Sequence, residues 1–155
     1  MTTRRAAILA ATLTALPFGG CGSGANNNVV AIVTSNFTPN PVVATASSDP
    51  AFTNTASFTL TLTETAGVGV TLTSLTPVIY EASGGVITAV LPASNSRTNV
   101  TIPSNRLEAS STLSIGFDVD YTAPNTGRVI LVRITLSIID DKGVSSSGVV
   151  DVPVS

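Results

Sequence analysis

The chain contains no histidine and no tryptophan, and its 155 residues include one cysteine, seven basic side chains and nine acidic ones. The absence of histidine excludes a Ser-His-Asp triad, a Cys-His dyad and a His-ligated zinc site. One cysteine cannot form a disulfide within the chain. The net charge of −2 provides no basic surface for a phosphate backbone, so we expect no nucleic-acid partner.

The N-terminal residues follow the order basic, apolar, small. Arg4 and Arg5 precede an uncharged run of 13 residues, 6–18, and Gly19-Gly20-Cys21 follows the run. A run of this length is shorter than the about 20 residues that a membrane-spanning helix needs. The order is that of a secretory signal peptide, in which the apolar stretch enters the bilayer and small residues fit the peptidase. The alternative is a buried N-terminal helix of the mature domain.

The single cysteine lies in a particular context. Phe18-Gly19-Gly20-Cys21 resembles the lipobox of bacterial lipoproteins, in which an apolar residue and two small residues precede a cysteine. The resemblance implies cleavage between Gly20 and Cys21, a diacylglycerol and palmitate-type acyl chains on Cys21, and stable attachment to a membrane. Phe18 departs from the leucine that is usual at its position. The alternative is an ordinary secretory signal that is cut nearby and leaves Cys21 as a free thiol.

These features divide the chain into three parts. Residues 1–20 form the predicted signal peptide, residues 21–28 the lipidated cysteine with a small, polar, flexible tether, and residues 29–155 the folded domain. Removal of residues 1–20 takes away Arg4 and Arg5, which leaves five basic and nine acidic residues and a formal charge of 5 − 9 = −4. We expect a protein on the exported side of the cell membrane or outer membrane, anchored by lipid rather than by charge.

From residue 29 onward, apolar and polar residues alternate with a period of two and β-branched residues are frequent, which favours strands over helices. Residues 57–64, 113–121 and 129–139 show the alternation most clearly. The sequence predicts an all-β fold, an antiparallel β-sandwich whose last strand lies at a sheet edge because Pro153 lacks an N–H. A hairpin joins this last strand to residues 129–139. The weaker predicted strands are residues 29–34, 70–75, 77–80, 86–91, 99–102 and 146–154.

A second resemblance concerns the segment Glu64-Thr65-Ala66-Gly67-Val68-Gly69-Val70-Thr71-Leu72-Thr73. It is similar to segments of secreted bacterial domains with immunoglobulin-like or fibronectin-type sandwiches. The resemblance implies this broad architecture only, because the core disulfide and the packed tryptophan of antibody domains are absent. From the residues themselves, Gly67 and Gly69 permit positive φ angles in a connection that larger side chains would strain.

Four aspartates are the candidates for a ligand site. Asp118 and Asp120 flank Val119 in a predicted strand, so we expect their side chains on one face about 7 Å apart. Together with Asp140 and Asp141 they would supply the oxygen ligands that Ca²⁺ prefers. The alternative is a solvated face, with Asp140 and Asp141 serving a turn. A glycosidase pair is disfavoured, because a sugar platform needs aromatic residues and these make up 5% of the chain.

The sequence favours a protein that is not an enzyme. The leading interpretation is a membrane-anchored envelope lipoprotein whose sandwich is a binding or structural module for another envelope protein or a polysaccharide. No cofactor is expected besides the covalent lipid on Cys21. One alternative is a small-ligand module that binds Ca²⁺ or a glycan through surface carboxylates. Another is a freely secreted subunit of an assembly built by strand pairing, which sparsely charged edge strands favour.

Overall fold

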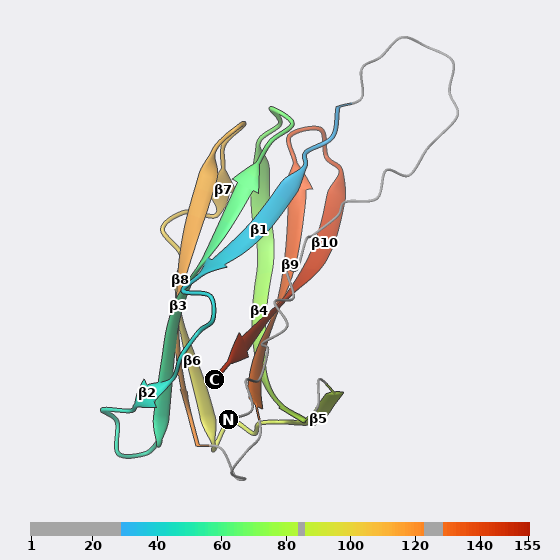
Figure 1. Cartoon of the computed structure of the whole chain (residues 1–155). Coiled ribbons are helices and arrows are strands. Elements are labelled where there is room, and N and C mark those ends of the chain that lie inside the picture. The colour runs from blue at the N-terminus through green and yellow to red at the C-terminus, as the bar shows by residue number, and fades with distance from the viewer. Residues whose placement is uncertain (1–28, 84–85, 123–128) are drawn as a thin grey trace, which may run out of the picture.

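Within the described residues, ten strands form two antiparallel sheets that pack face to face (Figure 1). The computed structural model describes residues 29–83, 86–122 and 129–155. The predicted signal peptide, Cys21 and the tether lie outside these residues. The all-β sandwich that the sequence predicts is confirmed. The strands are β1 (Val33–Thr38), β2 (Thr45–Ala46), β3 (Asn54–Glu64), β4 (Val70–Ser83), β5 (Val86–Val90), β6 (Ser96–Thr101), β7 (Arg106–Leu107), β8 (Thr112–Tyr121), β9 (Val129–Asp140) and β10 (Ser145–Val154).

Each sheet consists of four strands in a row and one short strand beside them. Sheet 1 has the order β1-β3-β8-β6, with β2 paired to β3. Sheet 2 has the order β10-β9-β4-β5, with β7 paired to β4. The chain therefore crosses repeatedly between the two layers, and the edge strands β1 and β10 lie on the same side of the sandwich (Figure 1).

The core lies between the sheets and is built from the inward residues of the alternating strands. In β3, Phe58, Leu60 and Leu62 are buried, and the threonines between them face outward. Phe58 stacks on Phe117 of β8, with the ring centroids 4.9 Å apart. Full burial of each such side chain contributes about 1.5–3 kcal/mol. The inward residues predicted for 113–121 are all buried, and those predicted for 129–139 are buried except the half-buried Ile138.

The predicted C-terminal hairpin is confirmed. β9 and β10 pair along the whole of β10, and Gly143 in their connection has a φ of 82°, a conformation that favours glycine. β10 is the edge of sheet 2, as Pro153 predicts. Val154 forms a parallel bridge with Val42, and the N–H of Ser155 donates to the Val42 carbonyl at 3.0 Å. The segment after β1 is thus joined to the end of sheet 2.

The first strand begins later than the sequence predicts. The prediction is residues 29–34, whereas β1 spans Val33–Thr38. The backbone N–H groups of Ala31 and Ile32 donate to the carboxylates of Asp140 and Glu64, at 3.4 Å and 3.3 Å, instead of to a neighbouring strand. Side-chain acceptors from distant parts of the chain therefore serve these two N–H groups, while the Ile32 carbonyl still accepts from the Thr65 N–H at 3.0 Å.

Two predicted strands, 70–75 and 77–80, are one continuous strand, β4. β4 pairs with β9 throughout, but on its other side it pairs with β7 only at its start and with β5 only from Tyr80 onward. Pro77 lies between these two stretches, where one side of β4 has no partner among the described strands. The missing N–H of Pro77 is tolerated there as it is at a sheet edge.

The other predicted strands lie within three residues of the observed bounds. The largest differences are at β3, which starts at Asn54 rather than residue 57, and at β6, which starts at Ser96 rather than residue 99. β2 and β7 have two residues each. They were not predicted, because two residues cannot show an alternating pattern.

Candidate functional site

The four aspartates of the predicted calcium site lie at opposite ends of the sandwich. Asp120 pairs with Thr55 near the start of β3. Asp140 accepts a hydrogen bond from the N–H of Ala31. The N–H of the next residue, Ile32, donates to Glu64, which lies at the far end of β3. In the part of the chain that the structure describes, no three acidic side chains converge as metal ligands. Asp118 and Asp120 are therefore not joined by Asp140 and Asp141.

Asp120 is buried, and the expectation that it lies on a solvated face is wrong. Its Oδ1 accepts hydrogen bonds from Thr55 Oγ1 and, at 3.4 Å, from Ser47 Oγ, and its Oδ2 accepts from Arg97 Nη2 at 2.6 Å. The hydrogen bond from Thr55 and the Arg97 guanidinium lower the pKa of Asp120 and outweigh burial, which raises it. Asp120 therefore anchors neighbouring segments with both of its oxygens.

Arg97 fastens the loop between β2 and β3 to sheet 1. Its Nη2 lies 2.9 Å from an Asp49 oxygen and 2.6 Å from an Asp120 oxygen, and its guanidinium lies 5.0 Å from the centre of the Phe52 ring. The hydrogen bond from the Ala51 N–H, followed by that from Arg97, lowers the pKa of Asp49. Because Arg97 is exposed, these ion pairs position the loop more than they stabilise the fold.

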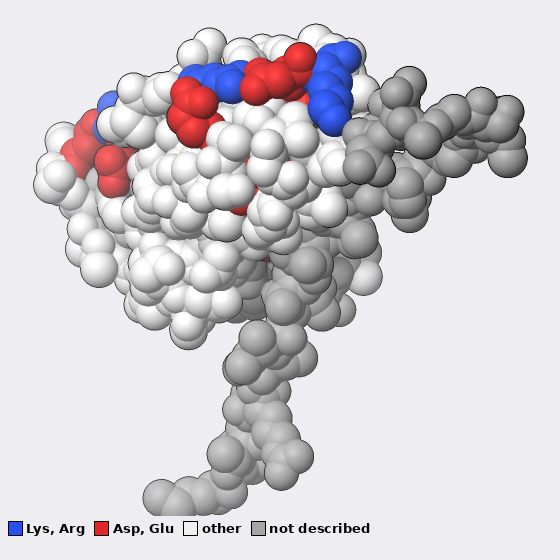
Figure 2. Space-filling model, turned by 90° about the horizontal axis from the view of Figure 1, so that it is seen from above, with Lys and Arg blue, Asp and Glu red and all other residues white. Residues whose placement is uncertain are grey.

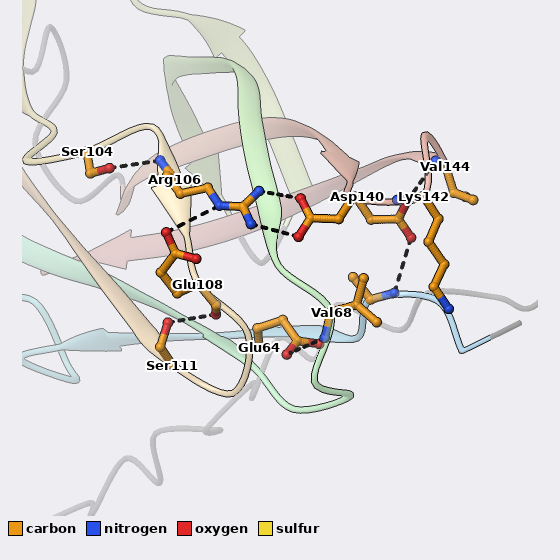
Figure 3. Close-up of polar contacts among 11 residues, drawn as sticks. Glu64, Val68, Ser104, Arg106, Glu108, Ser111, Asp140, Lys142 and Val144 are labelled. Carbon is orange, nitrogen blue, oxygen red and sulfur yellow. Dashed lines mark hydrogen bonds and ion pairs between the residues drawn. The ribbon is translucent and has the colours of Figure 1, made fainter. Parts of the chain in front are cut away.

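Asp140 closes the turn between β9 and β10, the role that the alternative interpretation assigned to it. Its Oδ1 accepts hydrogen bonds from the N–H groups of Lys142 at 2.9 Å and Val144 at 2.8 Å (Figure 3). Its Oδ2 accepts from Ala31 at 3.4 Å. Both oxygens of this buried carboxylate therefore serve backbone groups of the same chain.

Glu64 holds together the same end of the sandwich (Figure 3). Its carboxylate is buried, with 1% of the residue exposed, and accepts five backbone hydrogen bonds of 2.7–3.3 Å. Burial raises the pKa of Glu64, but the backbone donors outweigh this effect, and the net direction is down. The donors are the N–H groups of Ile32, Ala66, Gly67, Val68 and Ser110.

Strand alternation marks Glu64 as an inward residue, although it was not among the predicted site residues. Phe58, Leu60 and Leu62 face the core, and Glu64 is the next position in the same row. A carboxylate at an inward position indicates a buried acceptor that needs several donors. The donors themselves come from three separate segments, so their identity is not readable from the local sequence.

Arg106 forms an ion pair at the end of the sandwich that contains Glu64 and Asp140. Its guanidinium binds both oxygens of Asp141, one of them at 2.7 Å. Its Nε lies 3.4 Å from Glu108 (Figure 3). The hydrogen bonds from Arg106 lower the pKa of Asp141. Asp141 is thus engaged in an ion pair between β7 and the β9–β10 turn.

Gly69 is required for space rather than for a positive φ. Gly67 has a φ of 77° and so uses the freedom that glycine permits, whereas Gly69 is not among the described residues with positive φ. A Cβ at position 69 would lie 2.7 Å from Asp141 Oδ2 and closer still to Arg106 Nη2. The ion pair occupies the space in which a side chain would begin.

Gly69→Ala is expected to separate Arg106 from Asp141, because the flexible ends of these two side chains move more easily than the backbone. The pKa of Asp141 should then rise toward its ordinary value of 3.8. NMR titration of the side-chain carboxyl carbons measures this shift, and Arg106→Gln serves as the control that should raise the same pKa. An Asp141 pKa that stays at the wild-type value in Gly69→Ala would contradict the steric argument.

Charges at this end of the molecule alternate in sign. Figure 2 shows the described surface from this end, with blue and red side chains next to one another in a short row and most of the remaining surface uncharged. Glu108, Arg106 and Asp141 contact one another in this order. One positive and two negative charges leave a net charge of −1, so this row is not a large patch of one sign that steers a charged ligand.

The outer face of sheet 1 is covered mainly by hydroxyl groups. Residues that pair across antiparallel strands share a face, and the outward positions of the four main strands carry no side chain more apolar than threonine. We call this surface the hydroxyl face. It consists of Thr34, Asn36, Thr38, Thr55, Ser57, Thr59, Thr61, Thr63, Arg97, Asn99, Thr101, Thr112, Ser114, Gly116, Asp118 and Asp120.

A shallow hollow of about 280 Å³ opens on the hydroxyl face above Gly116. Its walls come from the end of β1, from β3 and from β8. Ser57 Oγ donates to Asp118 Oδ1 at 2.6 Å at the rim. Asp118 is exposed, unlike Asp120. Of the four predicted aspartates, Asp118 is the one that lines this hollow.

A second opening lies between the edge strands β1 and β10. It has a volume of about 30 Å³ and is lined by Ala31, Val33, Leu62, Leu136 and Ile138 together with residues 146–148 of β10. This is a tenth or less of the volume of pockets for drug-sized ligands, which is about 300–1,000 Å³. It therefore represents a gap in side-chain packing rather than a ligand pocket.

Comparisons with known proteins supply no family. No protein-family model matches this chain, and no curated protein matches it. Within residues 29–83, 86–122 and 129–155, there is no helix with the length and apolar character needed to cross a bilayer.

Proposed function

We propose that this chain is a lipid-anchored protein of the bacterial cell envelope, with a β-sandwich that acts as a binding or structural module and catalyses no reaction. The observation that carries the proposal is the N-terminal order of Arg4-Arg5, the apolar run 6–18 and Phe18-Gly19-Gly20-Cys21. The first described strand begins at Val33, 33 − 21 = 12 residues after the cysteine. The small, polar residues 22–28 suit a tether between the lipid and the folded domain.

The strand order supports an immunoglobulin-like assignment for the sandwich. Constant-type immunoglobulin domains have strands A-B-E-D in one sheet and G-F-C in the other. If β1, β3, β8 and β6 are strands A, B, E and D, sheet 1 has the first order. β10, β9 and β4 then have the order G-F-C, with β5 added beside C. This architecture offers faces, edges and loops for binding, and the site has to define the partner.

The ionisable groups support a module without catalytic chemistry. Glu64, Asp49, Asp120 and Asp141 have lowered pKa values, whereas a carboxylic acid that donates a proton near neutral pH needs a raised one. Three arginines are bound to carboxylates of the same chain. They are Arg97, Arg106 and Arg133, and their partners include Asp120, Asp141 and Asp151.

Cys21→Ala is expected to release the protein from the membrane. Wild-type protein expressed at full length in a bacterial host should sediment with membranes, because two or more acyl chains give stable anchoring. Its intact mass should equal that of residues 21–155 plus a diacylglycerol and further acyl groups. The variant should lack the mass of the lipid, and it should no longer be found in the membrane fraction as lipidated protein. Fractionation with mass spectrometry measures both properties.

Ser23→Ala is the matched control, because it changes the predicted tether without changing the thiol. It should fractionate as the wild type does. If wild type and Cys21→Ala are both unlipidated and soluble, the anchored module is wrong. The alternative of a freely secreted subunit that assembles by strand pairing would then be favoured.

A further inference from the structure

Gly116 interrupts the hydroxyl face near the centre of sheet 1. It pairs with Thr59 of β3 on one side and with Thr101 of β6 on the other. A glycine in a strand interior lowers stability because it adds backbone entropy to the unfolded chain and packs no side chain. Its neighbours in the outward row of β8 are Ser114 and Asp118. The missing side chain forms the floor of the hollow.

Neither backbone conformation nor packing requires glycine at this position. The described glycines with positive φ are Gly67 and Gly143, and Gly116 is not among them. A Cβ at position 116 would lie 3.6 Å from Thr101 Cβ, which is ordinary van der Waals contact. Gly69 differs, because a side chain there would collide with an ion pair. Besides bulges and bends, sites where a ligand or another backbone approaches closely are common places for a glycine in a strand interior.

The groups around the hollow match a ligand that has several hydroxyls and no negative charge. Asp118 accepts from Ser57 through Oδ1, and no residue in the described ranges donates to its Oδ2. A carboxylate only accepts hydrogen bonds, so Oδ2, which faces solvent, is free to accept from a ligand hydroxyl in place of water. The hydroxyls of Thr38 and Thr59 both donate and accept, and Pro39 adds an apolar wall. The exposed carboxylate opposes phosphate, sulfate and uronate groups.

We propose that the hollow above Gly116 binds one sugar unit of a neutral polysaccharide, while neighbouring units lie along the hydroxyl face. This inference rests on the proposed function and names the partner of the module. The hollow is slightly smaller than the about 300–1,000 Å³ of pockets for drug-sized ligands, which suits a single sugar unit. The stacked rings of Phe58 and Phe117, whose residues also line the hollow, pack against each other on the inner side of the sheet.

Many anchored copies would strengthen this binding. A hollow without an aromatic platform holds a single sugar unit weakly, because its hydrogen bonds replace similar bonds to water. A polysaccharide presents the same unit many times, and a membrane presents many copies of the protein. Such multivalency raises the overall affinity without further contacts.

The test uses lipidated protein in non-ionic detergent and native gels cast with dextran, galactomannan or mixed-linkage β-glucan. Wild type should be retarded by at least one of these neutral probes and not by alginate, which is anionic. Gly116→Thr fills the hollow and Asp118→Asn removes the carboxylate, so each should raise the dissociation constant at least tenfold. Thr135→Ser, a control on the outer face of sheet 2 and away from the hydroxyl face, should stay within twofold of wild type.

Two further readouts separate a binding role from a structural one. Gly116→Thr should melt at the wild-type temperature or a few degrees higher, because threonine suits an exposed strand position better than glycine. Hydrogen exchange measured by mass spectrometry should show protection of residues 57–59 and 114–118 when the retarding polysaccharide is present. Loss of binding would then accompany an intact or strengthened fold.

Three results would overturn the inference. They are no retardation by any neutral probe, unchanged binding by Gly116→Thr, and a lowered melting temperature of Gly116→Thr. The last result would make Gly116 a structural requirement. None of them affects the Cys21 fractionation experiment, so the anchored module stands or falls separately. Conversely, if the protein is not lipidated but binds a neutral polysaccharide through residues 57–59 and 114–118, the polysaccharide site is supported and the lipid anchor is wrong.

Discussion

Glu64→Ala is expected to lower the free energy of unfolding by about 3–5 kcal/mol, the range seen when one partner of a buried charged interaction is removed. Five backbone N–H groups lose their acceptor at once. Each buried donor that is left without an acceptor costs about 1–3 kcal/mol. Water that enters the vacated space can bind some of the five N–H groups, so the total loss is smaller than five times this value. Urea denaturation of the mature protein measures the change.

Glu108→Ala is the control for this substitution. The Glu108 side chain is 71% exposed and contacts Arg106 at 3.4 Å, so its removal should change stability by less than about 0.5 kcal/mol. A Glu64→Ala protein that unfolds at the same urea concentration as Glu108→Ala would show that the five hydrogen bonds do not stabilise the fold.

The same carboxylate predicts how stability depends on pH. The pKa of Glu64 is lower in the folded state than its ordinary value of 4.5. Its contribution is therefore fully present above pH 4.5 and is lost as the pH falls through the folded-state pKa. Glu64→Gln removes this titration, so its stability should change less steeply than that of wild type below pH 4.5. Parallel slopes would contradict a lowered pKa for Glu64.

Asp120→Ala is expected to lower the free energy of unfolding by about 2–3 kcal/mol, the upper range for hydrogen bonds to a charged group. The side chains of Ser47, Thr55 and Arg97 lose their common acceptor. The loop between β2 and β3 should also become more mobile, because Ser47 loses its acceptor and Arg97 keeps only Asp49 as an ion-pair partner. Thermal unfolding and hydrogen exchange of residues 47–53 measure the two effects.

Asp118→Ala is the matched control, since Asp118 lies on the same strand two residues away. It is exposed and bonds to Ser57 at 2.6 Å. Its removal should change stability by less than about 0.5 kcal/mol. Equal losses in the two variants would contradict the assignment of Asp120 as a buried anchor and Asp118 as a surface group.

The sequence predicted the fold where a strand alternates over many residues. β3, β8 and β9 were found within three residues of their bounds, because each buries one face and exposes the other. The start of β1 was misplaced, since the N–H groups of Ala31 and Ile32 bind carboxylates that lie far away in the chain. Pro77 divided β4 in the prediction, and only the sheet order shows that its missing donor lies beside an unpaired stretch.

The candidate site was less predictable for a similar reason. Strand alternation places Asp118 and Asp120 on one face, but it does not reveal that the loop around Asp49 covers the second of them. It also gives no indication that a side chain would fit at position 116, because this depends on the distance to Thr101 on the neighbouring strand. Sequence patterns thus identified the residue types on the hydroxyl face, and the packing of loops and neighbouring strands determined which remain accessible.

The direction in which the chain enters β1 has a mechanical consequence. β1 runs antiparallel to β3, and its first residue lies beside the last residue of β3. A force that pulls on residue 29 while the face of sheet 1 is held would act along β1. The ladder bonds lie across this direction, so they would share the load in shear rather than open one after another. The bonds from Ala31 and Ile32 to Asp140 and Glu64 would bear the load first, and the rate of forced unfolding would depend on them.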